Sequence, residues 1–293
     1  MIIKQKQIVM NRKIILLSIL MTICGISESH AQIKLGDKAM GALEKGVKGF
    51  TFSDADAAAL SKDAVDQMDA ENPVADAKDG YAIRLERLFG KHKSENGLTL
   101  NYKVYKVKDV NAFATADGSV RVFAGLMDIM DDNELLAVIG HEIGHVANHD
   151  SRDAVKAAYK KEALLDAAAS QSDKVASLSD SQLGKIGNAM LDSKHSRKQE
   201  TEADEYSYEF MKRNGYDVNA VESSFNILAK MSEGSQSSFM TRMMSSHPDS
   251  KDRAEKSKKK ATKEGVYKAY VQKPITNTAP SGGKKAPAKK KKK

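Results

Sequence analysis

The sequence predicts an α+β fold that is mainly helical, with a small antiparallel sheet packed against one central helix. Three observations lead to this fold class. Apolar residues recur at helical spacing over long stretches of the chain. Between Leu98 and Phe123 they alternate with polar residues, as in strands. The pattern His-Glu-x-x-His follows at residues 141–145, within a helical stretch. Helical and strand patterns segregated along the chain in this way are typical of α+β domains.

Length and composition indicate how large a core the protein can bury and which class of partner is not expected. A chain of 293 residues with 41% hydrophobic content can bury the core of one domain of moderate size. The formal net charge of +8 is concentrated in residues 272–293, which contain eight lysines and no acidic residue. The body of the chain is therefore not basic, and no nucleic acid partner is expected. The tail is expected to be disordered and to be attracted to an anionic membrane or cell-wall surface.

Residues 1–31 are expected to be an export signal. A basic stretch that ends at Lys13 precedes an apolar run from Ile14 to Ile26, and cleavage is expected after Ala31. The protein is thus predicted to be exported to the periplasm or cell envelope.

Two alternatives concern the same segment. Cys24, the single cysteine, could be processed as in a lipoprotein, although the bulky Ile23 before it argues against this. Translation could also start at Met10, because the signal is complete from there. If the segment is removed, the mature chain has no thiol and no disulfide.

Residues 36–93 are predicted to be helical and to pack around the core. Ser53 precedes an alanine-rich run that ends at Glu71, and Asn72-Pro73 interrupts it. A further helix carries the apolar residues from Ile83 to Phe89.

The sheet is predicted from three short segments. Leu98–Val107 alternates apolar and polar residues, and Asn111–Thr115 and Ser119–Phe123 flank the turn Ala116-Asp117-Gly118 as in a hairpin. The outer strand could pair with an extended peptide.

The central helix is predicted to begin at the N-cap candidates Asp131–Asn133 and to continue through Leu135–Asp150. Gly140 and Gly144 lie inside it, where each costs roughly 1 kcal/mol relative to alanine. We therefore expect another element to pack closely against this helix.

The chemistry is predicted from His141, Glu142 and His145. Residues four apart in a helix project from the same face, so both imidazoles can reach one metal ion. Glu142 lies beside them without being needed as a ligand. Zinc-dependent hydrolysis requires this arrangement, because the carboxylate can take a proton from the attacking water.

The segments after the central helix are predicted to be helical. Residues 151–196 form an insertion that could gate the site as a mobile helical hairpin or serve as a solvated spacer. Arg197–Gly215 is a second strong helix, and another is expected near Val218–Met231. The domain is expected to span residues 32–271.

A catalytic zinc takes a third protein ligand and leaves one position open. The candidates are His149, His195, Glu200, Glu202, Asp204, His247 and Asp249. On a straight helix His149 would lie roughly 12 Å from His141, too far to share an ion. Glu200 and Asp204 lie one turn apart on one face of the second helix, so one carboxylate can bind the metal while the other orients a ligand histidine.

At these residues the chain resembles the M48 family of gluzincin metallopeptidases, and most of all their compact periplasmic type. The matching residues are HEIGH at 141–145, ETEAD at 200–204 with Arg197 before it, Asn111 to Ala114 followed by Gly118 and Gly125-Leu126, and His247-Pro248 with Arg253. The resemblance covers about Leu98 to Arg253. It implies a zincin-type core, in which the small sheet packs against the helix of the HExxH motif.

The resemblance also implies a role for each site residue. One zinc ion per chain would be bound by His141, His145 and Glu200. Glu142 and His247 would be catalytic, with His247 helping to stabilise the oxyanion. Asp204 and Arg253 would lie behind the ligands, and Asn111, Ala112, Phe113 and Ala114 would lie beside the substrate. His149 and His195 are expected to be ordinary surface histidines, and Glu202 a solvated helix charge.

The sequence therefore predicts an exported zinc endopeptidase that acts on unfolded or extended polypeptides. Misfolded or damaged envelope proteins are the substrate class that the resemblance implies. The alternative is a non-catalytic, zinc-stabilised binding or holdase protein of the envelope. A purely structural site would have no use for Glu142 or for an open ligand position.

Overall fold

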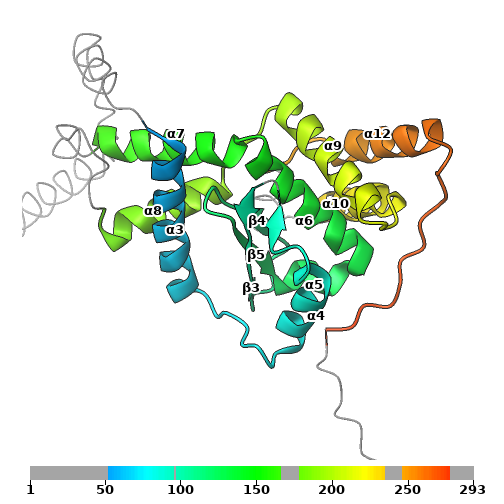
Figure 1. The fold of residues 1–293 in the computed structure, drawn as a ribbon, viewed down its shortest axis with the longest axis horizontal. Coiled ribbons are helices and arrows are strands. Elements are labelled where there is room, and N and C mark those ends of the chain that lie inside the picture. Colours follow the sequence, from blue (N-terminus) through cyan, green and yellow to red (C-terminus); the bar gives the residue numbers. More distant parts are fainter. Residues whose placement is uncertain (1–51, 96, 166–177, 235–245, 278–293) are drawn as a thin grey trace, which may run out of the picture. The chain divides into compact units, whose positions relative to one another are not determined.

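The computed structural model describes residues 52–95, 97–165, 178–234 and 246–277, and it has the predicted α+β fold (Figure 1). The helices are α3 (Asp54–Glu71), α4 (Gly80–Phe89), α5 (Ala124–Ile129), α6 (Asp132–Ala147), α7 (Asp150–Leu165), α8 (Asp180–Leu191), α9 (Arg197–Arg213), α10 (Asn219–Gly234) and α12 (Ser250–Lys263). The strands are β1 (Ser94–Glu95), β2 (Leu98–Thr99), β3 (Asn101–Tyr105), β4 (Ala112–Ala114) and β5 (Ser119–Phe123). The predicted export signal lies outside the described residues. Among the described helices, none has both the length and the apolar content needed to cross a membrane.

The central helix α6 begins where its sequence predicts. The side chain of Asp131 accepts hydrogen bonds from the N–H groups of Asn133 and Glu134 at 2.9 and 3.0 Å, and Glu134 accepts one from the N–H of Asp131 at 2.9 Å. This reciprocal capping box satisfies N–H groups that have no partner within the helix. Every residue from Glu134 to Val146 is buried, so α6 is the core of the fold.

The three-stranded sheet has the order β3-β5-β4 and is mixed. The predicted hairpin is confirmed, because β4 and β5 pair antiparallel, but β3 pairs parallel to β5. The expectation of an entirely antiparallel sheet is therefore wrong for β3. After β3 the chain passes to the far edge of the sheet, and β5 then returns to the middle. Alternation within a strand indicates which face is buried, but it does not indicate the neighbouring strand or its direction.

Helix α9 packs closely against α6, as the two helix glycines predict. A Cβ atom added at Gly140 would lie 3.0 Å from Cδ1 of Phe210, and one at Gly144 would lie 3.0 Å from Cα of Ala203. Only glycine allows the two backbones to approach this closely. The contact fixes how far α9 lies from the face of α6 that bears His141 and His145.

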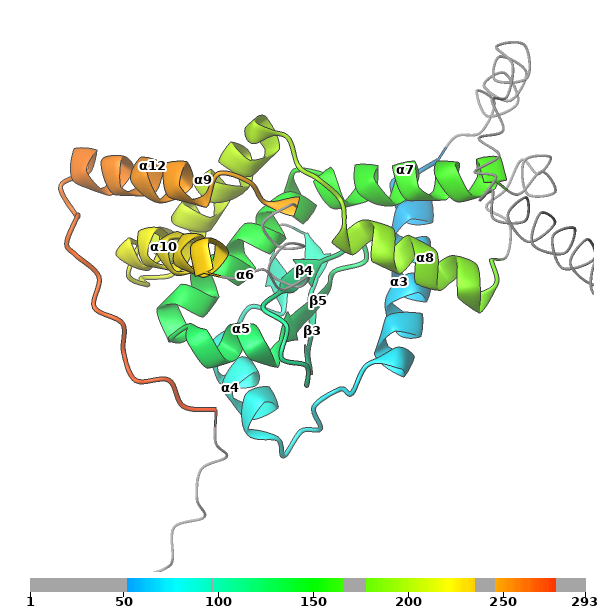
Figure 2. The same cartoon turned by 180° about the vertical axis from the view of Figure 1, so that it is seen from behind.

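The described parts of the insertion, α7 and α8, pack on α3 to one side of the sheet (Figures 1 and 2). Their shared apolar cluster includes Phe52 and Ala57 before and in α3, Val155 and Tyr159 in α7, and Ile186 in α8. The rings of Phe52 and Tyr159 lie 5.7 Å apart. A solvated spacer does not describe these parts, because they bury a core of their own.

Helix α12 was not expected, because its lysine-rich sequence gives a weak apolar pattern. Its buried Arg253 and Ala254 face α9 and α10. After α12 the chain runs back in an extended conformation to the start of α6 (Figure 1).

The sequence predicts a disordered tail from residue 272, but residues 272, 273 and 277 make hydrogen bonds to the body of the domain. Gln272 donates to Glu134 at 2.7 Å, the N–H of Lys273 donates to Asp131 at 2.7 Å, and Asn277 donates to Asp128 at 2.8 Å. Acceptors around the start of α6 thus hold this segment, although its composition is that of a linker.

The α6–α9 contact leads to a prediction about Gly144→Ala. Overpacking costs about 1–3 kcal/mol and the gain in helix propensity returns about 1 kcal/mol. The net loss is then between zero and about 2 kcal/mol, and we expect the free energy of unfolding to fall by about 1 kcal/mol in urea titrations. Gly184→Ala is the matched control: the nearest atom to its Cβ is Glu71 Oε1 at 3.7 Å, so stability should rise slightly. Equal stability of Gly144→Ala and wild type would show that α9 can move away from α6.

Candidate active site

Helix α6 places His141, Glu142 and His145 in the buried centre of the domain. Their exposed fractions are 3%, 5% and 2%, respectively. The Nε2 atoms of the two histidines lie 3.0 Å apart, so both rings present a nitrogen to the same point.

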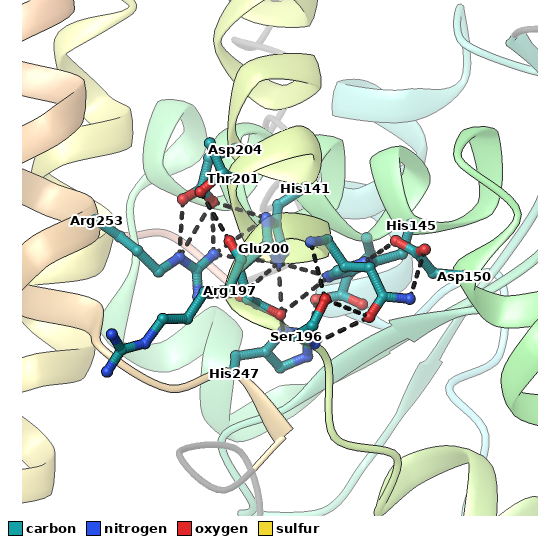
Figure 3. A network of polar contacts seen from close by, with 12 residues as sticks. His141, His145, Asp150, Ser196, Arg197, Glu200, Thr201, Asp204, His247 and Arg253 are labelled. Carbon is teal, nitrogen blue, oxygen red and sulfur yellow. Dashed lines mark hydrogen bonds and ion pairs between the residues drawn. The ribbon is translucent and has the colours of Figure 1, made fainter.

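The first turn of α9 brings Glu200 to this pair of histidines (Figure 3). Its Oε1 lies 3.4 Å from Nε2 of His145, and its Oε2 lies 3.6 Å from Nε2 of His141. Ser196 caps α9 through a capping box with Gln199, which fixes where the helix starts and hence where Glu200 lies. Among the third-ligand candidates on α9, Glu200 is therefore the one that faces both histidines.

The donor set fits a tetrahedral metal ion. Zinc–nitrogen bonds of about 2.0–2.1 Å place two tetrahedral ligand atoms about 3.3 Å apart, close to the separations found here. Oε2 of Glu200 is buried and accepts no hydrogen bond from the described residues, although Nη1 of Arg253 lies 2.6 Å away as an ion-pair partner. A buried carboxylate whose two oxygens each face an imidazole nitrogen is a group that a bound cation would stabilise.

Two aspartates hold the outer nitrogens of the histidine rings. Nδ1 of His141 lies 3.0 Å from Oδ1 of Asp204, and Nδ1 of His145 lies 2.9 Å from Oδ2 of Asp150. Such contacts fix the tautomer that leaves Nε2 free to bind a metal. Asp204 was expected near the ligands, whereas Asp150 was missed. The signal available in the sequence was a carboxylate shortly after the second histidine, just past the end of the helix.

Arg253 of α12 joins Glu200 and Asp204, two acidic residues of α9. Its guanidinium lies 2.6 Å from Glu200 and 2.6 Å from Asp204, and the residue is 4% exposed. The contact compensates two carboxylates that would otherwise be buried side by side.

His247 also reaches this centre, from the irregular segment before α12. Its Nδ1 lies 3.0 Å from Oε1 of Glu200 and 3.3 Å from Nε2 of His141, and its Nε2 lies 3.7 Å from Oε1 of Glu142. Ligand atoms of His141, His145, Glu200 and His247 all lie within 4.8 Å of one another. His247 thus occupies the side of the cluster nearest Glu142.

The electrostatics of the centre favour neutral His141 and ionised Glu200. Burial, followed by the charge of Arg253, lowers the pKa of His141 to about 3. Burial opposes ionisation of Glu200, but hydrogen bonds with His145 and His247 outweigh it and lower the pKa of this carboxyl group. Burial also opposes protonation of His145, yet Asp150 and Glu200 raise its pKa to about 9. Burial raises the pKa of Glu142, as suits a proton acceptor.

A cleft opens onto Glu142, His145 and His247. One wall is Asn111 to Thr115, which includes the four residues expected beside the substrate. The rest of the lining includes residues from the start of α7 and from the end of α8 with the connection that follows it. Among the described residues that line the cleft, none outside the histidine–carboxylate centre carries a formal charge.

The structure also shows where the other candidates for the third metal ligand lie. His149 adopts φ 67° just past the end of α6, so it does not continue the face of His145 as a straight helix would require. Glu202 is exposed, and Asp249 pairs with Arg197 at 3.1 Å. His195 was expected to be an ordinary surface residue, but it is half-buried in the cleft wall and stacks on His145.

A buried HExxH helix beside a small sheet, joined by a carboxylate from a second helix, defines a zincin-type metallopeptidase. More particularly, the chain belongs to peptidase family M48, which matches residues 84–261.

Two similar proteins come from Escherichia coli (strain K12). Metalloprotease LoiP is 42% identical over 230 residues, which cover 77% of this chain and 90% of LoiP. Metalloprotease YcaL is 42% identical over 209 residues, which cover 71% of this chain and 81% of YcaL. Protease HtpX of Xanthomonas euvesicatoria pv. vesicatoria (strain 85-10) is 51% identical over 51 residues, which cover 16% of this chain and 18% of HtpX. The protein is therefore a metallopeptidase with polypeptide substrates.

The contact between Asp150 and His145 leads to a prediction. Asp150→Ala is expected to weaken zinc binding about 10- to 100-fold, because the ring of His145 loses the acceptor that orients it. Titration of the metal-free protein with zinc against a chelating dye measures this. Asp153→Ala, an exposed acidic residue in the same turn of α7, should bind zinc like wild type. Wild-type affinity in Asp150→Ala would remove this carboxylate from the site.

Proposed function

We propose that this protein is an exported zinc endopeptidase that cleaves unfolded or extended polypeptides in the cell envelope. The observation that carries the proposal is the buried cluster of two imidazoles and one carboxylate at the floor of a cleft, with Glu142 beside it. The export signal predicted at residues 1–31 supports the location, and the lysine-rich tail supports contact with an anionic surface.

In this proposal His141, His145 and Glu200 bind the metal. Two nitrogens and one carboxylate oxygen are the donor set of many catalytic zinc sites. A bound zinc ion would polarise the substrate carbonyl and acidify an attacking water molecule. All three side chains come from regular helices and are nearly fully buried, so the protein holds them in place before the metal arrives.

Glu142 is the proposed general base. It follows His141 directly, lines the cleft and has a pKa raised by burial. It would accept the proton of the attacking water and pass it to the leaving nitrogen. A purely structural metal site would not need such a group in its cleft, which favours an enzyme over a binding or holdase protein.

His247 is proposed to donate a hydrogen bond to the developing oxyanion. The alternative is that it acts as a fourth ligand, since its Nδ1 lies among the candidate ligand atoms. We favour the donor role for two reasons. A catalytic site keeps one position open, and His247 is the member of the cluster that lies on an irregular segment rather than a helix.

Strand β4 is proposed to hold the substrate backbone. It is an edge strand of the sheet. The N–H of Thr115 donates to the carbonyl of Ser119, and the N–H of Phe123 donates to the carbonyl of Asn111. In an antiparallel pair this means that the backbone N–H and C=O groups of the odd-numbered residues of β4 point toward β5. Ala112 and Ala114 therefore turn their backbone groups away from β5. The side chain of Asn111 accepts from the N–H of Ala112, and Ser151 donates to the carbonyl of Ala114. The described residues make no hydrogen bond to the carbonyl of Ala112 or to the N–H of Ala114, so these two groups are proposed to pair with an extended peptide.

The described residues that line the cleft outside the histidine–carboxylate centre are uncharged, and this also bears on the substrate. Ala154, Met190 and Leu191 line the cleft together with the strand Ala112–Ala114. A charged side chain next to the scissile bond would lose hydration there without gaining a partner. The proposed substrates are therefore extended segments whose residues at the cleavage site are neutral, such as unfolding exposes in damaged proteins.

The experiment that tests the function is cleavage of casein by wild type and Glu142→Gln. The variant should keep one zinc ion per chain, because Glu142 is not a ligand, but its rate should fall at least ~10²-fold because proton transfer is lost. Metal analysis and the release of peptides with and without a chelator are the measurements. Cleavage by Glu142→Gln at the wild-type rate would exclude the mechanism. Zinc-loaded wild type that binds casein without cutting it would favour the holdase alternative.

The variant His247→Ala tests whether His247 donates to the oxyanion or binds the metal as a fourth ligand. An oxyanion donor can be removed without loss of the metal, and kcat should then fall about 10²-fold. Loss of stoichiometric zinc in this variant would instead identify His247 as a ligand.

A separate prediction concerns the edge strand. Ala114→Pro removes the outward N–H without removing a bond to β5, so kcat/KM for an unfolded substrate should fall about tenfold or more. Ala114→Ser keeps the N–H and is the matched control. Zinc content and thermal stability should stay at wild-type values in both variants. If the proline variant cleaves like the serine variant, peptide pairing with β4 is not used.

A further inference from the structure

The connection between α8 and α9 carries a histidine that the ligand set does not use. We propose that His195 is a positioning residue, which fixes the ring of His145 by stacking on it and so raises the affinity of the site for its metal. The proposal rests on the assignment of His145 as a ligand in the proposed function.

The two rings form a close, nearly parallel pair. Their centroids lie 3.8 Å apart and their planes meet at 16°. The edge of the His145 ring is held at the same time by Asp150, 2.9 Å from Nδ1. One ring edge and one ring face are therefore constrained by two different elements. Rotation of His145 about its side-chain bonds would lose the contact with Asp150 and move the ring against His195.

His195 is itself anchored without help from the metal. Its backbone N–H donates to the carbonyl of Ser246 at 3.2 Å. Its neighbour Ser196 is the N-cap of α9, held by the side chain of Gln199, whose amide also donates to Asp150 at 2.8 Å. The support on the face of His145 and the support on its edge thus belong to one connected set of contacts.

A ligand role for His195 explains the geometry less well. Ligand atoms of His145, Asp150 and His195 do lie within 4.8 Å of one another. The lone pairs of an imidazole lie in the plane of the ring, however, and a stacked His195 presents its face to His145. Nδ1 of His145 is already engaged with Asp150, so the trio offers no common point for an ion beside the main cluster.

Stacking has two expected effects on metal binding. An aromatic pair contributes beyond the area that it buries, and the magnitude for such pairs corresponds to about a two- to tenfold change in an equilibrium constant. The ring also excludes water from one face of His145 at the cleft wall. Both effects depend on a flat aromatic ring and neither depends on the imidazole nitrogens of His195.

The test compares His195→Phe, His195→Leu and His195→Ala. Zinc affinity is measured by titration of the metal-free protein against a chelating dye, and the cobalt-substituted protein reports ligand geometry through its visible spectrum. We expect His195→Phe to stay within about twofold of wild type. His195→Ala should bind zinc about two- to tenfold more weakly, with a broadened cobalt spectrum, and His195→Leu should lie between them. All variants keep the backbone bond to Ser246.

The controls separate this proposal from the proposed function. His149→Ala removes a histidine near the site that makes no stack on His145 and should change nothing. If His195→Ala does not fold, the zinc affinities of His195→Phe and His195→Leu still test the stacking role. Wild-type zinc affinity in both His195→Ala and His195→Leu, or an equal loss of affinity in His195→Phe and His195→Ala, would overturn the stacking role. The proposed function would still stand if the wild-type protein cleaves casein. A wild-type protein that binds no zinc would overturn both.

Discussion

The close contact between α6 and α9 is the constraint on which the site depends. Gly140 and Gly144 add no side chain of their own to the contact, so the ring of Phe210 lies against Gly140 and the backbone of Ala203 lies against Gly144. Glu200 lies one turn before Ala203 on the same helix, so the distance between the backbones sets how near its carboxylate comes to His141 and His145. Glycine has a low helix propensity at both positions, but it allows α9 to lie this close to α6.

Bringing imidazoles, carboxylates and a guanidinium into a dry interior creates a second requirement. Each buried charge needs a partner, and the structure supplies one from a different element for almost every group. Arg253 of α12 lies between Glu200 and Asp204, and Asp150 at the start of α7 holds His145. The same contacts that compensate the charges also fix the directions of the rings. Stability and pre-organisation of the centre therefore have a common origin.

The elements around the centre determine access to it. Strand β4 supplies one wall of the cleft, and α7 with the end of α8 supplies the other. The α3–α7–α8 cluster has its own apolar core, so this wall is supported independently of α6 and α9. Residues such as Met190 and His195 border the cleft although they belong to a segment whose sequence resembles a solvated linker.

The sequence by itself determined the local geometry of this protein. The capping box at Asp131, the helix of the HExxH motif, the hairpin of β4 and β5 and the need for a close neighbour at Gly140 and Gly144 all follow from residues a few positions apart. Backbone geometry relates such residues directly.

Only the tertiary structure decided which distant groups meet. It shows that Glu200 rather than Glu202 faces the histidines, as the family resemblance implied, and it alone decided that His195 supports His145 and that β3 runs parallel to β5. These relations join residues up to 59 positions apart, and tertiary packing and strand pairing set them. No pattern within one segment records that packing, which is why the site was predictable in its centre and not in its surroundings.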